Sequence, residues 1–250
     1  MKVLVIVPAR YQSSRFPGKP LVDINGKSMI QRVYEQATKA SLVDQVVVAT
    51  DDDRIFQHLN SLGYAVEMTQ ANHQSGTDRC AEVAKKYEDY EIVVNVQGDE
   101  PFIAPEQINA VIQPLLEQKA QISTLAKKIS ELTVLENPNV VKVVRQANGN
   151  ALYFSRSPIP FFRNIPKTEW LPQQAHYKHL GIYGFRRGTL LSITPLPLSK
   201  LEQAESLEQL RWLENGYSIA VALTELESFG IDTREDLEKA IASISTRPTS

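Results

Sequence analysis

Short apolar runs alternate with segments of helical spacing along the first 116 residues of the chain. Four of these runs are predicted to be strands: 3–7, 46–50, 65–68 and 92–96. All of them except 65–68 are uncharged and rich in β-branched residues, as buried strands are. Pro8 is predicted to end the first strand, since proline donates no hydrogen bond to a ladder. The segments between the runs carry helix-capping residues and one apolar face each. This βαβα alternation predicts an α/β fold.

The alternation breaks after residue 122. Two apolar runs at 140–144 and 151–154 flank an Asn-Gly-Asn turn and predict an antiparallel hairpin. Residues 157–172 are rich in proline, and we interpret them as an ordered excursion with contacts of its own, not as a linker between domains.

The last third of the sequence predicts two further strands and two helices. Residues 176–185 alternate as a strand does, with His179, Gly181 and Tyr183 on one face. Ser199 and Glu202 form a capping box that opens one helical stretch with an apolar stripe of Leu207, Leu210 and Leu213. A strand at 218–222 and a helix from Arg234 follow.

The composition narrows the class of protein. A chain of 250 residues with 42% hydrophobic content is long enough for one substantial core, so we expect a single domain over 1–250 with an embedded subdomain at about 122–190. The net charge of -2, from 27 basic and 29 acidic residues, favours neither nucleic acid nor an anionic membrane as a partner. No apolar stretch reaches spanning length and no signal sequence is evident, so we expect a cytoplasmic protein with no membrane contact. The single cysteine, Cys80, excludes an internal disulfide.

The first loop carries the strongest chemical signal. Arg10, Arg15 and Lys19 lie directly after the first predicted strand, with Ser13 and Gly18 between them. Arginine and lysine side chains bind phosphate oxygens, and glycine lets backbone N–H groups approach an anion closely. Ligands of open α/β sheets bind at the carboxyl ends of the strands, so the loop predicts a polyphosphate site. A solvated basic connection is the alternative.

Carboxylates follow other strands. Asp99 comes after Gly98 at the end of the fourth strand and is the first candidate ligand for Mg²⁺, with a turn cap as the alternative. Asp232, before the last helix, is equally well explained as a helix cap. The acidic triplet at 51–53 is better explained by capping of the second helix than by metal binding.

For several other polar residues, the sequence does not distinguish a structural role from ligand binding. Ser75 and Gly76 either cap a helix or hold a base edge or ribose. Arg156 and His179 are ordinarily surface or strand residues. Glu208 and Gln209 lie off the predicted apolar stripe, where solvent is the default neighbour.

Seven motifs together resemble the 3-deoxy-manno-octulosonate cytidylyltransferase (CMP-Kdo synthetase) family. They span nearly the whole chain in order: PAR-x-x-S-x-R-x-PGKPL at 8–21, HQSGTDR at 73–79, VQGDEP at 96–101, LYFSR at 152–156, HLGIYGF at 179–185, LEQLRWLENG at 207–216 and G-x-DT at 230–233. The last motif departs from the family pattern, because Arg234 stands where proline is usual. The resemblance implies a GT-A-like nucleotidyltransferase: a Rossmann-like mixed central sheet flanked by helices, with a smaller embedded α/β subdomain.

The resemblance also implies roles for individual residues. Those implied to bind the nucleotide are Ala9, Arg10, Ser13, Arg15, Lys19, Gln74, Ser75 and Gly76. Those implied to bind the sugar are Arg79, Gln97, Arg156, His179, Tyr183, Glu208 and Gln209. Asp99 and Asp232 are the implied ligands of Mg²⁺ and, with Arg10 and Lys19, the implied catalytic set.

The implied reaction joins CTP and 3-deoxy-D-manno-octulosonate to give the CMP-sugar and pyrophosphate, for lipopolysaccharide biosynthesis, in a homodimer. An acylneuraminate cytidylyltransferase is the alternative enzyme, although the motifs at 179–185 and 207–216 favour the eight-carbon acid. An 8-amino form of the sugar stays open, since one pocket residue could set that preference. A nucleotide-binding regulator without activity is the alternative from another class; both candidate magnesium carboxylates are present, which disfavours it.

Overall fold

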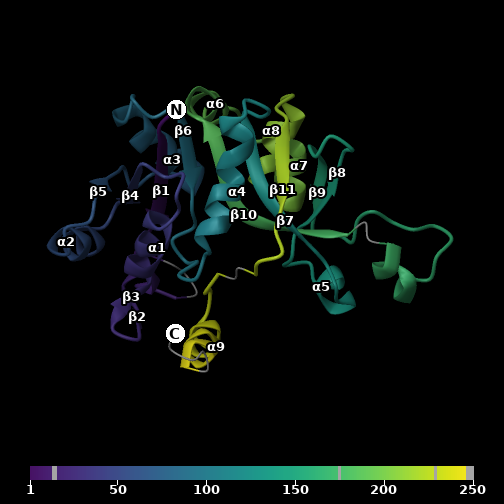
Figure 1. The fold of residues 1–250 in the computed structure, drawn as a ribbon, viewed down its shortest axis with the longest axis horizontal. Coiled ribbons are helices and arrows are strands. Elements are labelled where there is room, and N and C mark those ends of the chain that lie inside the picture. Colours follow the sequence, from purple (N-terminus) through teal and green to yellow (C-terminus); the bar gives the residue numbers. More distant parts are fainter. Residues whose placement is uncertain (13–15, 174–175, 228–229, 246–250) are drawn as a thin grey trace. The chain divides into compact units, whose positions relative to one another are not determined.

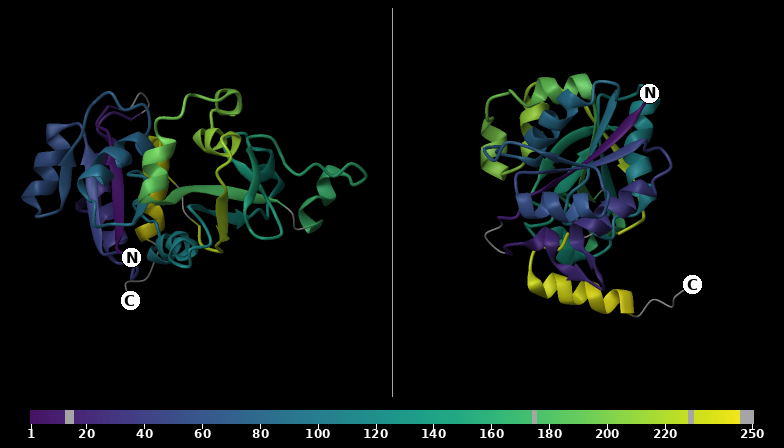
Figure 2. Two further views of the ribbon diagram at one scale, coloured as in Figure 1. Left: turned by 90° about the horizontal axis from the view of Figure 1, so that it is seen from above. Right: turned by 90° about the vertical axis from the view of Figure 1, so that its left-hand side faces the viewer.

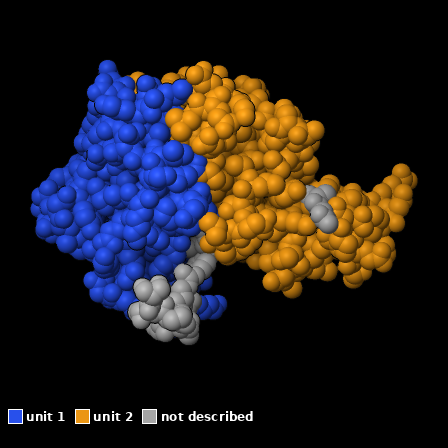
Figure 3. All heavy atoms as spheres, viewed as in Figure 1, with its two compact units in different colours: residues 1–109, 228–250 blue, residues 110–227 orange. Residues whose placement is uncertain are grey.

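The computed structural model describes residues 1–12, 16–173, 176–227 and 230–245 (Figures 1 and 2). The chain divides into two compact units, the first formed by residues 1–109 with 228–250 and the second by 110–227 (Figure 3). The predicted subdomain at 122–190 falls within the second unit. No helix in the described ranges is both long and apolar enough to cross a membrane.

The first unit is built on four parallel strands. Their order is β6 (Ile92–Asn95), β1 (Val3–Ala9), β4 (Gln45–Thr50) and β5 (Val66–Met68). The helices α1 (Met29–Thr38), α2 (Asp53–Ser61) and α3 (Gly76–Lys86) connect the strands and pack against them. Burial on both faces explains why β6, β1 and β4 read as uncharged runs, whereas the edge strand β5 is only partly buried and carries Glu67. The predicted βαβα alternation is confirmed.

The predicted end of the first strand is wrong. β1 continues through Pro8 to Ala9. Its ladder with β6 stops at the Ile6–Asn95 pair, whereas its ladder with β4 continues to the Ala9–Thr50 pair. Proline is tolerated here because this end of the strand has lost one of its two neighbours.

A short hairpin follows the first loop. Lys19 begins the 3₁₀ turn η1 (Lys19–Leu21), which leads to β2 (Asp23–Ile24) and β3 (Lys27–Ser28). Asn25 and Gly26 between these strands have φ of 50° and 82°, as a type I′ turn requires. The last helix, α9 (Arg234–Ser245), lies beside this hairpin, because Ile24, Ile231 and Ala240 share one apolar cluster (Figures 1 and 2).

The second unit contains five strands of mixed direction. Neighbours among them pair in the order β11 (Ile219–Leu223), β7 (Ile122–Lys128), β10 (Tyr177–Arg186), β8 (Lys142–Arg145) and β9 (Ala151–Ser155). β11 is parallel to β7 and the other pairs are antiparallel, including the predicted hairpin of β8 and β9. The remaining elements are α4 (Pro105–Leu116), which crosses the boundary between the units in sequence, and α5 (Leu132–Glu136), η2 (Lys167–Glu169), η3 (Leu171–Gln173), α6 (Arg187–Ile193), α7 (Lys200–Glu205) and α8 (Glu208–Glu214).

Two predictions for this unit need correction. The helical stretch opened by Ser199 is two helices, because Ser206 adopts φ 52° and ends α7. The alternation of β10 is interrupted, since its register against β7 shifts between Leu180 and Tyr183. The proline-rich segment is ordered where it is described, with Trp170 packed against Ile129 and Leu135.

Candidate active site

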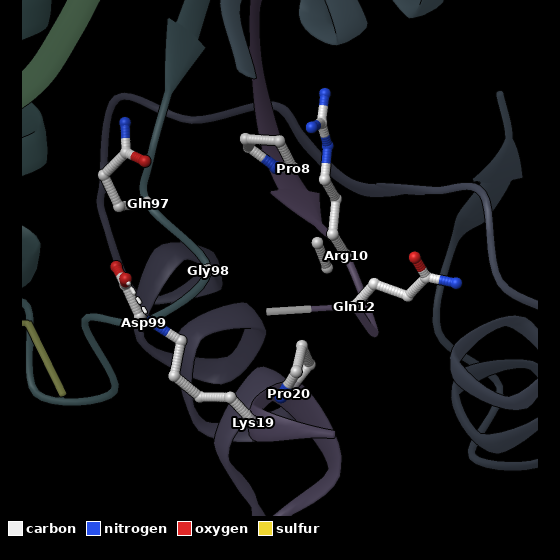
Figure 4. A pocket seen from close by; sticks show the side chains of 9 residues that line it. Pro8, Arg10, Gln12, Lys19, Pro20, Gln97, Gly98 and Asp99 are labelled. Carbon is white, nitrogen blue, oxygen red and sulfur yellow. Dashed lines mark hydrogen bonds and ion pairs between the residues drawn. The ribbon is translucent and has the colours of Figure 1, made fainter. Parts of the chain in front are cut away.

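Three charged residues that are distant in the sequence meet in the first unit. Lys19 Nζ lies 2.7 Å from Asp99 Oδ2 and 3.2 Å from Asp232 Oδ1 (Figure 4 for Lys19 and Asp99). The lysine side chain is 13% exposed, against 30% for Asp99 and 48% for Asp232. The structure therefore brings together both predicted metal ligands and one predicted phosphate-binding cation.

Backbone contacts hold the two aspartates next to each other. The Ile231 N–H donates to the Asp99 carbonyl oxygen at 2.9 Å, and Ile231 is itself fully buried. The Asp232 N–H donates to Asp236 Oδ2 at 3.1 Å, at the start of α9. Asp236 therefore accepts the backbone N–H bonds at the start of α9. The Asp232 carboxylate accepts instead from Lys19.

Gly98 allows the Asp99 loop to approach the end of β1. A Cβ atom on Gly98 would lie 2.6 Å from the Pro8 carbonyl oxygen, which is closer than any side chain tolerates. The glycine is therefore required by close packing of two strand ends.

A cavity of about 190 Å³ lies at this edge of the sheet. Figure 4 shows its lining, which includes Pro8, Arg10, Gln12, Lys19, Gln97 and Asp99. Sites that enclose a whole drug-sized ligand have about 300–1,000 Å³, so this cavity has room for the phosphate end of a nucleotide. Pro8 and Gln12 line the cavity but were not predicted as site residues. Their positions, at the end of the first strand and in the loop after it, could have indicated this role.

Arg10 connects this cavity to the segment before α3. Its guanidinium donates to the His73 carbonyl oxygen, and the His73 ring in turn contacts Glu82. Ala9 is buried at the end of β1. Ser13 and Arg15, also predicted to bind the nucleotide, lie outside the described residues.

The predicted base-recognition segment begins α3. Ser75 Oγ accepts from the Asp78 N–H and the Asp78 carboxylate accepts from the Ser75 N–H, each at 3.1 Å, which completes a capping box. A Cβ atom on Gly76 would lie 3.2 Å from Pro8 Cγ, so this helix start packs beside the end of β1. Capping is therefore one role of Ser75. The predicted contact of Gln74, Ser75 and Gly76 with a base stays a prediction.

Arg79 is fully buried and paired. Its Nη2 lies 3.0 Å from Asp51 Oδ2, and its Nη1 donates to Thr69 Oγ1. Of the acidic triplet, Asp52 is the N-cap of α2 and Asp53 lies in its first turn. Asp51 therefore neutralises Arg79 and does not share the predicted capping role. The predicted contact of Arg79 with the sugar stays a prediction.

Gln97, also predicted to contact the sugar, belongs to the first unit and lines the cavity, whereas the remaining predicted sugar contacts lie in the second unit. The Arg156 guanidinium donates to the carbonyl oxygens of Glu205, Pro138 and Ser206. Glu208 Oε1 accepts from Arg211 Nη2 at 2.9 Å, and Gln209 is 5% exposed. These contacts position the side chains, and their predicted role toward a sugar stays a prediction.

His179 and Tyr183 form one aromatic cluster, with ring centroids 5.3 Å apart. His179 Nε2 lies 2.9 Å from Thr124 Oγ1, and burial lowers the pKa of His179 to about 3. Burial, with the nearby Glu208 carboxylate, raises the pKa of Tyr183 well above its usual value. The buried Tyr183 hydroxyl and the Trp212 indole nitrogen have no hydrogen-bond partner among the described residues, and their rings are 5.1 Å apart. Trp212 was missed by sequence reasoning because it reads as an apolar helix position.

The Asp99 and Asp232 carboxylates fit a magnesium ion. They already hold one cation, the Lys19 ammonium, between them. The described residues contain no group of three acidic, histidine or cysteine side chains that could form an all-protein metal cage. Mg²⁺ typically takes one or two protein carboxylates and completes its shell with water and substrate phosphates, so two hard oxygen donors beside a phosphate-sized cavity suit it.

The sequence matches the cytidylyltransferase family over residues 4–221. The chain belongs to this family. A 3-deoxy-manno-octulosonate cytidylyltransferase from Parabacteroides distasonis is 54% identical over 252 residues, which cover 99% of this chain and 100% of that protein. The protein of the same name from Bacteroides thetaiotaomicron is 53% identical, over 96% of this chain and 97% of that protein. The family resemblance of the sequence motifs is therefore confirmed.

Solved structures of cytidylyltransferases agree with this assignment. A CMP:2-keto-3-deoxy-manno-octonic acid synthetase complexed with CTP superposes with a TM-score of 0.92 at 43% identity, over 98% of this chain and 99% of that one. A cytidylyltransferase from Leptospira borgpetersenii shares the fold, with a TM-score of 0.66 at 19% identity. The predicted mixed α/β nucleotidyltransferase fold is thus confirmed.

Proposed function

We propose that this protein transfers the cytidylyl group of CTP to 3-deoxy-D-manno-octulosonate, releasing pyrophosphate. The observation that carries the proposal is the meeting of Lys19 with Asp99 and Asp232 beside the cavity at the end of β1. Relatives that are identical to this chain at more than half of the aligned positions are named for this activity. Lys19, Asp99 and Asp232, the charged constellation, come from three distant segments of the sequence, so no single local motif explains their meeting.

In the proposed reaction the sugar hydroxyl attacks the α-phosphorus of CTP and the bond to the β-phosphate oxygen breaks. The protein contributes alignment and charge neutralisation, which supply most of the rate in such transfers. Arg10 and Lys19 line the cavity and stabilise the charge that gathers on the departing pyrophosphate. Asp99 and Asp232 would hold Mg²⁺, which neutralises triphosphate charge and makes a nearby hydroxyl more acidic.

The acceptor contacts are assigned to the second unit and to Arg79 and Gln97. His179, neutral because of its low pKa, acts as a hydrogen-bonding group for a sugar hydroxyl and not as a general base. The unpartnered Tyr183 hydroxyl offers a second such group. Arg156 is proposed to meet the sugar carboxylate, supported by the LYFSR resemblance.

We further propose a cytoplasmic homodimer that acts in lipopolysaccharide biosynthesis, with Mg²⁺ as its cofactor. The family resemblance supports each of these points, and sedimentation analysis together with chelation of the metal tests the dimer and the cofactor. Removal of Mg²⁺ by a chelator is expected to abolish turnover, and its return to restore it.

A substrate panel tests the proposed reaction. Pyrophosphate release is measured with CTP, UTP, ATP and GTP against 3-deoxy-D-manno-octulosonate, its 8-amino analogue and an acylneuraminate. We expect turnover with CTP and an eight-carbon acid. Preference for the acylneuraminate would contradict the proposed acceptor, and CTP binding without turnover on any acid would favour the regulator.

Substitution of the carboxylates tests the site. Asp99→Asn and Asp232→Asn keep the side-chain shape and remove the charge, so each is expected to lower kcat by about 100-fold or more. The matched control is Asp89→Asn, which changes an exposed aspartate outside the constellation. Full activity of both site variants would refute the assignment.

A further inference from the structure

Tyr11 is packed against two partners from different parts of the first unit. A Cβ atom on Gly18 would lie 3.1 Å from the Tyr11 hydroxyl oxygen and 3.2 Å from its Cζ, so the ring rests against the Gly18 backbone. The guanidinium carbon of Arg54 lies 3.3 Å from the centroid of the same ring. The tyrosine is thus in contact with both the end of its own loop and the start of α2.

Arg54 is itself held in one orientation. Its Nε donates to Asp52 Oδ1 at 2.9 Å and its Nη2 to Asp52 Oδ2 at 2.7 Å, which is a bidentate pair. Asp52 is the N-cap of α2, and its Oδ1 also accepts from the Arg54 N–H at 3.0 Å. Because Asp52 engages the Nε and Nη2 edge of the guanidinium, the plane of the group is fixed and its flat face can stack on an aromatic ring.

The loop that Tyr11 belongs to is closed at the same point. The Gly18 N–H donates to the Tyr11 carbonyl oxygen at 2.9 Å, and Gly18 has φ 73°, the left-handed conformation that glycine adopts without strain. Arg10 directly precedes Tyr11 and Lys19 directly follows Gly18. The two cations that line the cavity are therefore tied to each other and, through Arg54 and Asp52, to α2.

We propose that Tyr11 and Arg54 are positioning residues, which hold Arg10 and Lys19 in place for the triphosphate before the nucleotide arrives. This inference rests on the proposed function. Side chains that are positioned in advance lose less conformational freedom on binding, so the contribution of Tyr11 and Arg54 is expected in nucleotide affinity. Once CTP is bound, its phosphates order the same cations, so the rate of the bound complex depends little on the stack. Arg54 acts through Tyr11, since Asp52 already pairs its charge.

A double-mutant cycle tests the proposal. Arg54→Ala, Tyr11→Leu and the double variant are compared by KM and kcat in pyrophosphate release, and by the Kd of CTP from calorimetry without the sugar. Arg54→Ala is expected to raise KM and Kd for CTP about two- to fivefold, the range of an exposed cation–π contact, with kcat changed less than twofold. Tyr11→Leu is expected to raise both by about tenfold, because the packing against Gly18 is also lost.

Conservative variants and a control complete the design. Tyr11→Phe keeps the ring and is expected to bind CTP as the wild type does, whereas Arg54→Lys keeps the charge but loses the flat fork and should resemble Arg54→Ala. Lys2→Ala removes another cation placed over a tyrosine ring, that of Tyr90 at 5.8 Å, away from the loop. It is expected to leave the Kd of CTP unchanged.

In the Tyr11→Leu background, Arg54→Ala is expected to have no further effect, because the two residues act in one stack. Additive effects would show that Arg54 contacts the nucleotide directly and would overturn the proposal. A lower kcat at unchanged KM would do the same, since it is the result expected from a smaller folded fraction. Calorimetry with CTP alone keeps the inference testable if the wild type fails to turn over the sugar, an outcome that would refute only the proposed function.

Discussion

At the scale of single residues, His179 makes the stability of the second unit depend on pH. Burial lowers its pKa in the folded protein to about 3, against about 6.5 in an unfolded chain. Between these values the unfolded state binds more protons, so the free energy of unfolding is full above about pH 6.5 and falls as the pH decreases. One histidine gives a slope of at most about 1.4 kcal/mol per pH unit, which is approached below about pH 6, where the unfolded state is almost fully protonated and the folded state is not.

Tryptophan fluorescence during urea unfolding measures this slope, because both tryptophans of the chain, Trp170 and Trp212, belong to the second unit. The slope between pH 6.5 and 5 is compared in the wild type and in His179→Gln, above the range in which most carboxylates titrate. The variant is expected to have the shallower slope, whatever its stability at pH 8. Equal slopes would show that His179 carries its proton in the folded state.

Also at this scale, the sequence could predict which residues form the charged constellation but not all of their partners. Lys19 and Asp99 were predicted to share one edge of the sheet, because loops after parallel strands meet there. Asp232 joined that predicted site only through the family resemblance of its motif, since the residues alone explained it equally well as a helix cap. Asp51 was predicted as part of a capping triplet, since local spacing favours capping. Its pairing with the buried Arg79 depends on how α3 packs on the sheet, which no local pattern contains.

At the scale of elements, two helices begin with the same kind of capping box, and comparing them distinguishes an effect on stability from an effect on nucleotide binding. Ser75 caps α3 and Ser199 caps α7, each with an acidic residue three positions later. Ser75→Ala and Ser199→Ala are each expected to lower the free energy of unfolding by about 1 kcal/mol, measured by urea unfolding. Only Ser75→Ala is expected to raise the KM for CTP as well, because α3 begins beside Pro8 at the cavity. An equal rise in KM for Ser199→Ala would mean that the effect comes from lost stability.

The predicted elements were most accurate where burial alone decides and least accurate where backbone conformation does. The strands β6, β1 and β4 and the helix faces of the first unit follow from the apolar pattern, since these strands are buried on both faces. Ser206 ends α7 with φ 52°, a conformation that serine rarely adopts and that the sequence therefore does not indicate. The register shift in β10 also has no signal in the sequence, where apolar and polar residues continue to alternate. Both features depend on tertiary packing, which overrides local propensity.

At the scale of the whole molecule, the two substrates are expected to protect different parts of the chain from hydrogen exchange. All predicted nucleotide contacts belong to the first unit, whereas five of the predicted sugar contacts belong to the second: Arg156, His179, Tyr183, Glu208 and Gln209. Neither CTP nor the sugar reacts alone, so each can be studied by itself. With CTP and Mg²⁺ we expect slower exchange at the end of β1, at residues 97–99 and at the start of α3. With the sugar we expect it in β10 and α8.

The size of the protection distinguishes specific binding from a general effect of added ligand. A ligand at one hundred times its Kd stabilises the bound form by about 2.7 kcal/mol, so amides that exchange only from the free form slow by about 100-fold. ATP at the same concentration and Asp99→Asn with CTP are the controls, because one changes the base and the other removes a magnesium ligand. Both are expected to give much less protection. Protection by CTP confined to β10 and α8 would place the nucleotide in the second unit and contradict the assignment of Arg10, Lys19 and Asp99 to its phosphates.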